Sequence, residues 1–495
     1  MNMGRRMVLV RRVAWIALAV ATLWISGHAH VKAGFTLPSP WNDEPWFMWS
    51  AVSLAEDSTF FSESLNPFRV VPMSPVFQVP MALLFKLAGV SFGLARGMSW
   101  AYMALAYLGV LVLVARRPWP FIAAGVASLF FLGASTVVAA NMVRPEAMVW
   151  ALAVWACVCT DRGRSWSALA ISGIGALIHP VGVIFFAGVL MLVMLDGWPR
   201  RRVLPPQGWD WPILITALAV LAGHLWFVCL NWGAVAADSQ AAANDLHGGI
   251  IQRIFASNKT IWLALYGALA GASVWRLREL RVPVILGGCA LATMVVRPQM
   301  WYEIYNQMGF MWLTLAVSWT LHGIAAWICS SHSGPRAVPI RALVPALAFG
   351  LGLLPMLRFC QLNGFITGFH NYPAKLAWGW GMQMDPQPYI TAADIRAVVQ
   401  EVERHVADGQ KHRVFFMPEA DAFFYREYLP TNVIAYQGVW TEEQADLAVF
   451  RLSRHPPRWW TDQYVMSHLQ RYGGEGIAPF YERDGTEKWV LVPRR

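Results

Sequence analysis

The feature that most constrains this chain is a series of long apolar segments separated by short loops that carry arginine. Of the 495 residues, 57% are hydrophobic and only 14% are charged. Because about 20 apolar residues cross a bilayer as a helix, this pattern predicts a polytopic α-helical membrane protein with about eleven transmembrane helices. The predicted spans are Met7–Ser26, Leu94–Ala115, Pro120–Ala139, Ala147–Thr160, Trp166–Ile178, Val181–Leu195, Pro212–Trp232, Thr260–Trp275, Val282–Val296, Ile304–Cys329 and Ala342–Leu362.

The orientation in the membrane depends on the stretch Val76–Val90, which carries Lys86 and either crosses the bilayer or lies in its interface. If it lies in the interface, Arg116, Arg117 and the later arginine clusters all fall on the side of the basic N-terminus. The inward segments then hold roughly twice as many basic residues as the longer outer segments, as cytoplasmic loops should. We therefore predict an inner-membrane protein with a cytoplasmic N-terminus and a first outer loop at about residues 27–93.

The composition changes after residue 365, where the membrane unit (residues 1–365) is predicted to end. Prolines mark residues 366–389 as a linker, and residues 390–495 are predicted to form a soluble α/β domain on the extracytoplasmic side. Its predicted elements are a helix at Asp394–Val406 and buried strands at Arg413–Met417, Leu447–Phe450 and Trp489–Val492. The segment Met417–Asp421 is predicted to be a solvated loop.

Several classes of function are disfavoured by the sequence. The net charge of +10 comes from arginines scattered among short loops, so no basic face for nucleic acid is expected. The six cysteines lie in or beside apolar segments without metal-ligand spacing, which indicates packing residues. No phosphate-binding loop or dinucleotide fingerprint is present, so a nucleotide-sugar donor is not expected. The long first apolar run without a small-residue cleavage site indicates a retained span rather than a signal peptide.

Ionisable residues gather at the ends of the spans that this topology places outside. Such residues are candidates for function because burying a charge in a membrane is costly, although any one of them is more often an interfacial charge that reaches water. Acids there can take a proton from an alcohol, and basic residues can hold an anionic phosphate. The candidates are Asp43, Glu44, Arg69, Lys86, Arg144, Glu146, His179, Asp245, Arg253, Arg297, Tyr302 and Glu303.

A series of short motifs follows the first span in a fixed order. They are Asn42-Asp43-Glu44, Met73-Ser74-Pro75-Val76, Leu83-Leu84-Phe85-Lys86-Leu87-Ala88-Gly89-Val90-Ser91 followed by Ala95-Arg96, Arg144-Pro145-Glu146, and Ala176-Leu177-Ile178-His179-Pro180. With these motifs the first two hundred residues resemble the GT-C superfamily of integral-membrane glycosyltransferases, in particular bacterial relatives of protein O-mannosyltransferases and the aminoarabinose transferases of lipid A. The resemblance fades through the later spans and is absent from the C-terminal unit.

The resemblance implies transfer of a sugar from a polyprenyl-phosphate donor to an acceptor hydroxyl at the outer face, with inversion. It implies that an acid of the first loop is the general base, and Asp43 aligns with the first acid of the family's pair. Pro45 departs from the aromatic-rich signature that follows the pair, which leaves open whether Asp43 or Glu44 faces the acceptor. In several relatives a second acid or a divalent metal ion assists, so Glu146 is a ligand, an orienting group or neither.

The predicted phosphate ligands are Lys86, Arg297, Arg69, Arg144 and Arg253, of which Lys86 and Arg297 lie nearest to apolar stretches. The acceptor is an envelope lipid, glycan or protein that the sequence does not define. Two other classes fit the same pattern. A transporter or flippase of a lipid-linked sugar would use the same cavity without a base. A pair of broken helices in corresponding halves of the chain would favour this hypothesis, and the sequence lacks such a pair. A non-catalytic membrane scaffold would display the C-terminal domain and tolerate the loss of Asp43.

Overall fold

The computed structural model describes residues 3–32, 43–60, 74–133, 136, 140, 142–197, 205–233, 235–236, 260–275, 278–296, 303–331, 338–354, 390–436, 445–453, 462–474, 476–485 and 487–493. Within these ranges the side chains of Asp43, Glu303 and Glu419, among others, are not described. The predicted linker, residues 366–389, lies outside the described residues.

A helix occupies each range in which the sequence predicts a span. These helices are α1 (Met3–Lys32), α4 (Phe92–Val114), α5 (Pro120–Phe131), α7 (Glu146–Asp161), α8 (Ser165–Ile178), α9 (Pro180–Gly197), α10 (Asp210–Leu230), α13 (Thr260–Trp275), α14 (Arg281–Val296), α15 (Glu303–Ser331) and α16 (Val338–Gly352). A short 3-10 helix, η2 (Arg278–Leu280), precedes α14. Helix α5 ends before the predicted Ala139, because the chain turns at Leu132 and Gly133.

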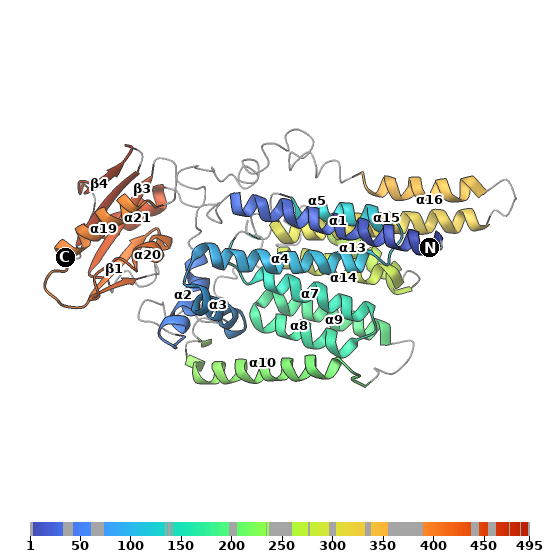
Figure 1. The fold of residues 1–495 in the computed structure, drawn as a ribbon, viewed down its shortest axis with the longest axis horizontal. Coiled ribbons are helices and arrows are strands. Elements are labelled where there is room, and N and C mark those ends of the chain that lie inside the picture. Colours follow the sequence, from blue (N-terminus) through green and yellow to red (C-terminus); the bar gives the residue numbers. More distant parts are fainter. Residues whose placement is uncertain are drawn as a thin grey trace.

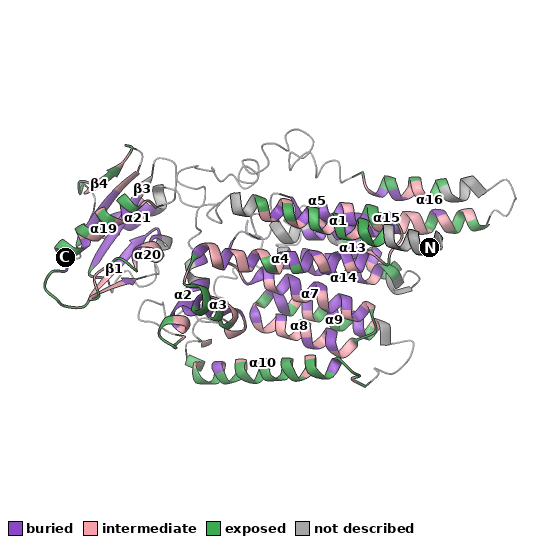
Figure 2. Cartoon of the chain, viewed as in Figure 1, coloured by how far each residue is buried: buried purple, intermediate pink, exposed green. Residues whose placement is uncertain are grey.

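Three of the described helices are long and apolar enough to cross a membrane by length and composition: Phe92–Val114, Asp210–Leu230 and Met308–Ser330. They differ in how much of their surface the rest of the protein covers. Helix α4 lies inside the bundle with 61% of its apolar window buried, whereas only 11% of the α10 window is buried (Figure 2). An apolar helix so little covered by protein needs another apolar environment, which a bilayer supplies.

The helices pack through small residues and a sharp hairpin. Gly109 of α4 lies against α7, where an added Cβ atom would come within 2.7 Å of the Val154 side chain. Small residues of this kind let membrane helices approach closely. The hairpin predicted at His179-Pro180 is confirmed, since α8 ends at Ile178 and α9 begins at Pro180. Proline suits the first position of a helix because the amide hydrogen that it lacks would have no partner there.

The residues at one end of the bundle are joined by polar contacts. Arg117 follows α4 and pairs with Asp161 at the end of α7, at 2.7 Å between Nη2 and Oδ1. Arg281 donates to the carbonyl oxygen of Leu195 near the end of α9, at 3.1 Å. These are loops that the sequence places together in the cytoplasm. The C-terminal α/β unit lies at the opposite end of the bundle (Figure 1). This arrangement agrees with the prediction that these loops lie at one end of the bundle and the C-terminal unit at the other. That the loops face the cytoplasm stays a prediction.

Two short helices lie at the end nearer the C-terminal unit: α2 (Asp43–Glu56) and α3 (Pro75–Ala88) (Figure 1). Ser74 caps α3 by accepting a hydrogen bond from the amide of Val76, and Gly89 ends it with a φ of 85° that glycine adopts without strain. With 14 residues, α3 is about 21 Å long, short of the roughly 30 Å hydrocarbon core. Helix α8, which lies in a predicted span, has the same 14 residues, so the interfacial position of Val76–Val90 stays a prediction.

Residues 390–493 contain a five-stranded sheet in the order β2-β1-β3-β5-β4. Strands β2, β1 and β3 are parallel to one another. Strand β5 is antiparallel to β3 on one side and to β4 on the other. The strands are β1 (His412–Met417), β2 (Val433–Tyr436), β3 (Leu447–Ser453), β4 (Tyr481–Arg483) and β5 (Glu487–Pro493), and the helices are α19 (Ala392–His405), α20 (Glu419–Tyr425) and α21 (Asp462–Arg471). One predicted helix and three predicted strands correspond to α19, β1, β3 and β5.

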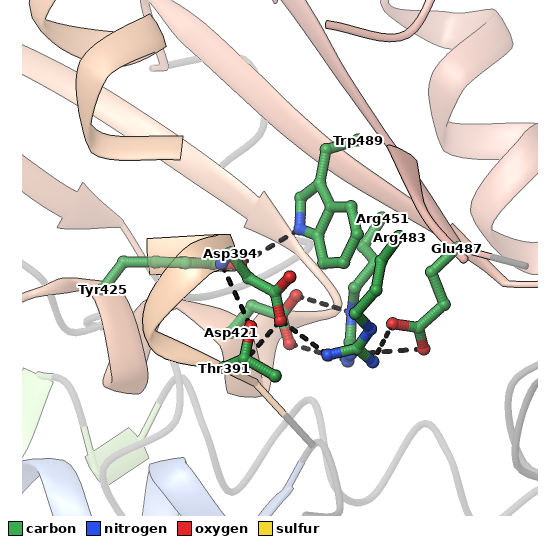
Figure 3. A network of polar contacts seen from close by, with 8 residues as sticks. All are labelled: Thr391, Asp394, Asp421, Tyr425, Arg451, Arg483, Glu487 and Trp489. Carbon is green, nitrogen blue, oxygen red and sulfur yellow. Dashed lines mark hydrogen bonds and ion pairs between the residues drawn. The ribbon is translucent and has the colours of Figure 1, made fainter. Parts of the chain in front are cut away.

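The solvated loop predicted at Met417–Asp421 is wrong. Pro418 follows β1 in a cis peptide bond, and α20 begins at the next residue. Asp421 is buried because its carboxylate pairs with the guanidinium of Arg451, at 3.0 Å. Figure 3 shows this pair within a polar network that includes Tyr425 and Trp489. A buried ion pair needs further partners to offset desolvation, and Glu487 lies 3.7 Å from Arg451 Nη1.

Candidate functional site

The acidic pair Asp43-Glu44 lies in the first turn of α2. Acidic residues favour a helix N-terminus, where the backbone dipole is positive, and Pro45 is tolerated there because its missing amide hydrogen costs no helical bond. Glu44 is fully buried, as is Arg96 of α4. The two side chains form a bidentate pair, in which Nε donates to Oε2 at 2.9 Å and Nη2 donates to Oε1 at 2.6 Å.

A second element also binds the Glu44 carboxylate. The backbone amide of Val143 donates to Oε2 at 2.9 Å, which joins the segment before α7 to α2. Glu44 therefore joins α2 to α4 and to the segment before α7. A buried carboxylate with a guanidinium and an amide donor is held in one orientation. This position suits a residue that orients its helix rather than one that reaches an acceptor.

Phe47, one turn further along α2, makes two additional contacts. Its carbonyl oxygen accepts a hydrogen bond from the buried side chain of Gln78 on α3, at 2.9 Å. The guanidinium of Arg144 lies over its ring, 5.7 Å from the ring centroid. We call Glu44, Phe47, Gln78, Arg96 and Val143 the α2 anchor, because together they fix the first turn and a half of α2 against α3, α4 and the segment before α7.

Arg144 and Glu146 form a second ion pair directly beside the α2 anchor. Arg144 Nη2 lies 2.8 Å from Glu146 Oε1, and both side chains are largely covered. His179, at the break between α8 and α9, also acts electrostatically on the Glu146 carboxylate. Its Nδ1 accepts a hydrogen bond from the amide of Val181, at 3.3 Å. The structure therefore brings together Glu44, Arg144, Glu146 and His179 from the predicted set, at the end of the bundle nearer the C-terminal unit.

Other predicted site residues are not brought into this cluster by the described structure. Lys86, in the last turn of α3, is exposed beside the exposed apolar side chains of Leu83 and Leu87. Such a surface suits a helix that lies against lipid with its ammonium group near the interface. Arg69, Asp245, Arg253, Arg297 and Tyr302 lie outside the described residues, as do the side chains of Asp43 and Glu303.

An apolar cavity of about 630 Å³ lies between α3 and the C-terminal half of α10. Val76 and Val79 of α3 form one wall, and Trp226 and Phe227 of α10 form another. Because α10 is largely uncovered by protein, the cavity adjoins the surface that faces a bilayer. Its lining is that of a site for a hydrocarbon chain.

Arg96 and Gln78 were not among the candidate residues predicted from sequence. Arg96 could have been found, because an arginine inside an apolar segment marks a functional or structural ion pair. Nothing in the sequence indicates that Gln78 binds the carbonyl of Phe47, since that contact joins two helices across an interface.

A divalent metal ion has no evident ligand set in the described part of the chain. No group of three histidine, cysteine or acidic side chains lies close enough to bind one there. Glu44 and Glu146 are each engaged by an arginine, and a cation would have to compete with those guanidinium groups. The five described cysteines are free.

The described fold is a helical unit with a buried charged anchor at one end and an α/β unit in contact with that end. No protein-family model matches this sequence. No curated protein matches it either. Among solved structures, the chain is similar to ArnT from Cupriavidus metallidurans bound to undecaprenyl phosphate, with a TM-score of 0.43 and 12% sequence identity over 98% of each chain. At that similarity the residues of the two chains are not paired one by one, so the roles below rest on contacts within this chain.

Proposed function

We propose that this protein is an integral-membrane glycosyltransferase of the GT-C type that uses a polyprenyl-phosphate sugar as its donor. In this proposal the sugar passes to an acceptor hydroxyl at the outer face of the cytoplasmic membrane. The observation that carries the proposal is the α2 anchor, in which the buried Glu44–Arg96 pair fixes the helix that begins with Asp43. A catalytic acid needs a supporting structure of this kind, because a misplacement of about 1 Å can cost about 10²-fold in rate.

In the proposed mechanism Asp43 is the general base. It takes the proton of the acceptor hydroxyl as that oxygen bonds to the anomeric carbon of the sugar. The bond between the anomeric carbon and the phosphate oxygen breaks, and its electron pair leaves with the polyprenyl phosphate. Attack from the face opposite the leaving group inverts the anomeric centre. Glu44 and Arg96 hold the helix, and neither exchanges a proton.

The donor is proposed to bind along α3. Its hydrocarbon chain would occupy the apolar cavity between α3 and α10, and Lys86 at the other end of α3 would offset the charge of the leaving phosphate. Arg69, Arg253 and Arg297 are proposed as further phosphate ligands on the basis of sequence. Arg144 is less suited to that role than predicted, because Glu146 already engages its guanidinium.

The test is donor turnover by the full chain in lipid nanodiscs. Undecaprenyl-phosphate-linked sugars of several kinds would be supplied with envelope fractions from a deletion strain, and release of undecaprenyl phosphate would be measured by mass spectrometry. We expect release with at least one donor, dependent on the envelope fraction and absent with the corresponding nucleotide sugars. Movement of intact donor across a vesicle bilayer without release would instead identify a flippase. The absence of both release and movement with every donor tested would support a scaffold.

A further inference from the structure

Helix α20 of the C-terminal unit is fixed on one side to the sheet. Asp421 in α20 pairs with Arg451 of β3, and the Tyr425 hydroxyl accepts a hydrogen bond from Trp489 Nε1 of β5 at 3.0 Å (Figure 3). All four of these side chains are buried. These two buried pairs, one to β3 and one to β5, hold α20 against the sheet.

The other side of this helix contacts α2. Arg426, the residue that ends α20, places its two terminal nitrogens 3.0 and 3.1 Å from the two oxygens of Glu56, the last residue of α2. Its guanidinium also lies over the ring of Trp49, 5.8 Å from the centroid, and Trp49 is buried. The arginine side chain is 12% exposed and the Glu56 side chain 47% exposed, so solvent screens the pair from the Glu56 side. Glu427 also lies 3.2 Å from Arg426 Nη2 and shares the guanidinium.

A second contact reaches the α2 anchor itself. The ring of Phe424 stacks on Phe92 at the start of α4, with centroids 5.5 Å apart and planes 16° from parallel. The guanidinium of Arg96 lies over the same Phe92 ring, 5.1 Å from its centroid. Phe424 therefore packs on Phe92, and Phe92 in turn contacts Arg96, the partner of Glu44.

From these contacts we infer that the C-terminal unit positions α2, and that Phe424 and Arg426 are positioning residues for the reaction. The inference rests on the proposed function, because α2 begins with the proposed base. A 14-residue helix is only marginally stable by itself, so its contacts decide where its first turn lies. Glu44 fixes one end of α2, and Arg426 fixes the other end. A unit added only for acceptor binding or stability would not need to contact both the end of α2 and the support of its anchor.

The experiment uses charge reversal in the full chain in nanodiscs. Arg426→Glu and Glu56→Arg each place like charges together, whereas the double variant restores an ion pair of opposite polarity. The control is Lys488→Glu, which reverses one partner of the Lys488–Glu482 pair on the far strands, at 2.8 Å, with both side chains well exposed. Two quantities are measured: hydrogen exchange of the amides of residues 47–54, and kcat and KM for release of undecaprenyl phosphate.

We expect each single variant to speed exchange in α2 and to lower kcat by about tenfold or more with little change in KM, because a displaced base slows chemistry more than donor binding. The double variant should recover most of both losses, and the control should change neither. Phe424→Ala should act like the single reversals, and Phe424→Tyr should retain the stack and the rate. The variants Phe424→Ala and Phe424→Tyr test the inference even if a reversed charge prevents folding.

Two results would overturn the inference. Unchanged exchange in α2 in all variants would show that the unit does not hold this helix. Faster exchange with unchanged kcat would show that the contact serves stability alone. Hydrogen exchange is measured without substrate, so it separates this inference from the proposed function. If the wild-type chain turned over no donor, the proposed function would be refuted, and the exchange rates would still test whether α20 holds α2.

Discussion

Glu44 and Arg96 lie 52 positions apart in the sequence and meet as a bidentate ion pair that no solvent reaches. The pair joins the start of α2 to the start of α4, and the amide of Val143 adds a third element to it. Taking two charges out of water costs several kcal/mol per ion, and excellent geometry is needed to offset that cost. The pair is therefore better explained by the orientation that it imposes on α2 than by stability that it adds.

The first prediction concerns this pair. Arg96→Gln should lower the free energy of unfolding by about 3–5 kcal/mol, because it removes the charged partner of the buried Glu44 carboxylate. Glu44→Gln removes the carboxylate that pairs with the buried Arg96 guanidinium and should cost a similar amount. The double variant should cost clearly less than the sum of the two. Thermal or denaturant unfolding in detergent measures all three, and a double variant that loses the full sum would mean that the two residues act independently.

The apolar pattern of the sequence predicted where the helices lie. It also located the hairpin at His179-Pro180 and four elements of the C-terminal unit, because local periodicity and proline act within one segment. Boundaries were less accurate: α5 stops before Ala139, and Met417–Asp421 holds a cis proline and the start of a helix rather than a solvated loop. The second error arises where a tertiary contact, that of Asp421 with Arg451, accompanies the local conformation.

The candidate site could be predicted only in part. Sidedness placed Glu44, Arg144, Glu146 and His179 at one end of the bundle, because charges at span ends follow from topology alone. Sequence did not show that Glu44 and Glu146 each have an arginine partner, nor that Phe424 packs on Phe92. Those pairs join segments that only the packed structure brings together.

A second prediction concerns the orientation of the chain in the membrane. Reporter fusions after Arg117, Arg202 and Arg281 should give a cytoplasmic signal, and fusions after Gly248 and Arg495 should give an outer signal, because the inward loops carry the basic residues. The contact between Arg281 and the carbonyl of Leu195 requires the loops at that end to share one side. A cytoplasmic signal at Arg495 would reverse the arrangement and place the proposed site on the wrong face.

The third prediction tests the donor phosphate. Lys86→Gln should weaken binding of undecaprenyl phosphate by about 10- to 100-fold, the effect of removing a charged hydrogen bond worth about 1.5–3 kcal/mol. Folding should be unaffected because Lys86 is exposed. Binding is measured by native mass spectrometry over a range of lipid concentrations, with Lys488→Gln as the matched loss of an exposed lysine. Equal affinity in both variants would remove Lys86 from the phosphate site.

The fourth prediction separates structure from chemistry in the C-terminal unit. Asp421→Asn should lower the free energy of unfolding by up to about 3–5 kcal/mol, because the buried Arg451 charge then keeps only the more distant Glu487 carboxylate, at 3.7 Å. Glu482→Gln should cost about 0–1 kcal/mol, since its pair with Lys488 is solvated. Where Asp421→Asn and Glu419→Gln together still fold, release of undecaprenyl phosphate should persist. Complete loss of turnover in that folded double variant would place a catalytic group in this unit.

The last prediction is that Asp43 is the catalytic base. An acceptor hydroxyl is a poor nucleophile until its proton is removed as the new bond forms, and a general base contributes about 10²- to 10⁴-fold. Asp43 starts a helix whose next residue is fixed on Arg96, so the acid is carried on a rigid support while Glu44 is already engaged. Asp43→Asn should therefore lower kcat by at least about 10²-fold while undecaprenyl phosphate binding and unfolding temperature stay near wild type. Glu44→Gln should instead lower the unfolding temperature, and any folded fraction should lose less activity per molecule than Asp43→Asn. Single-turnover kinetics on folded protein distinguish the two. Near-normal turnover in Asp43→Asn, together with a folded but inactive Glu44→Gln or Glu146→Gln, would transfer the role of base to one of those acids.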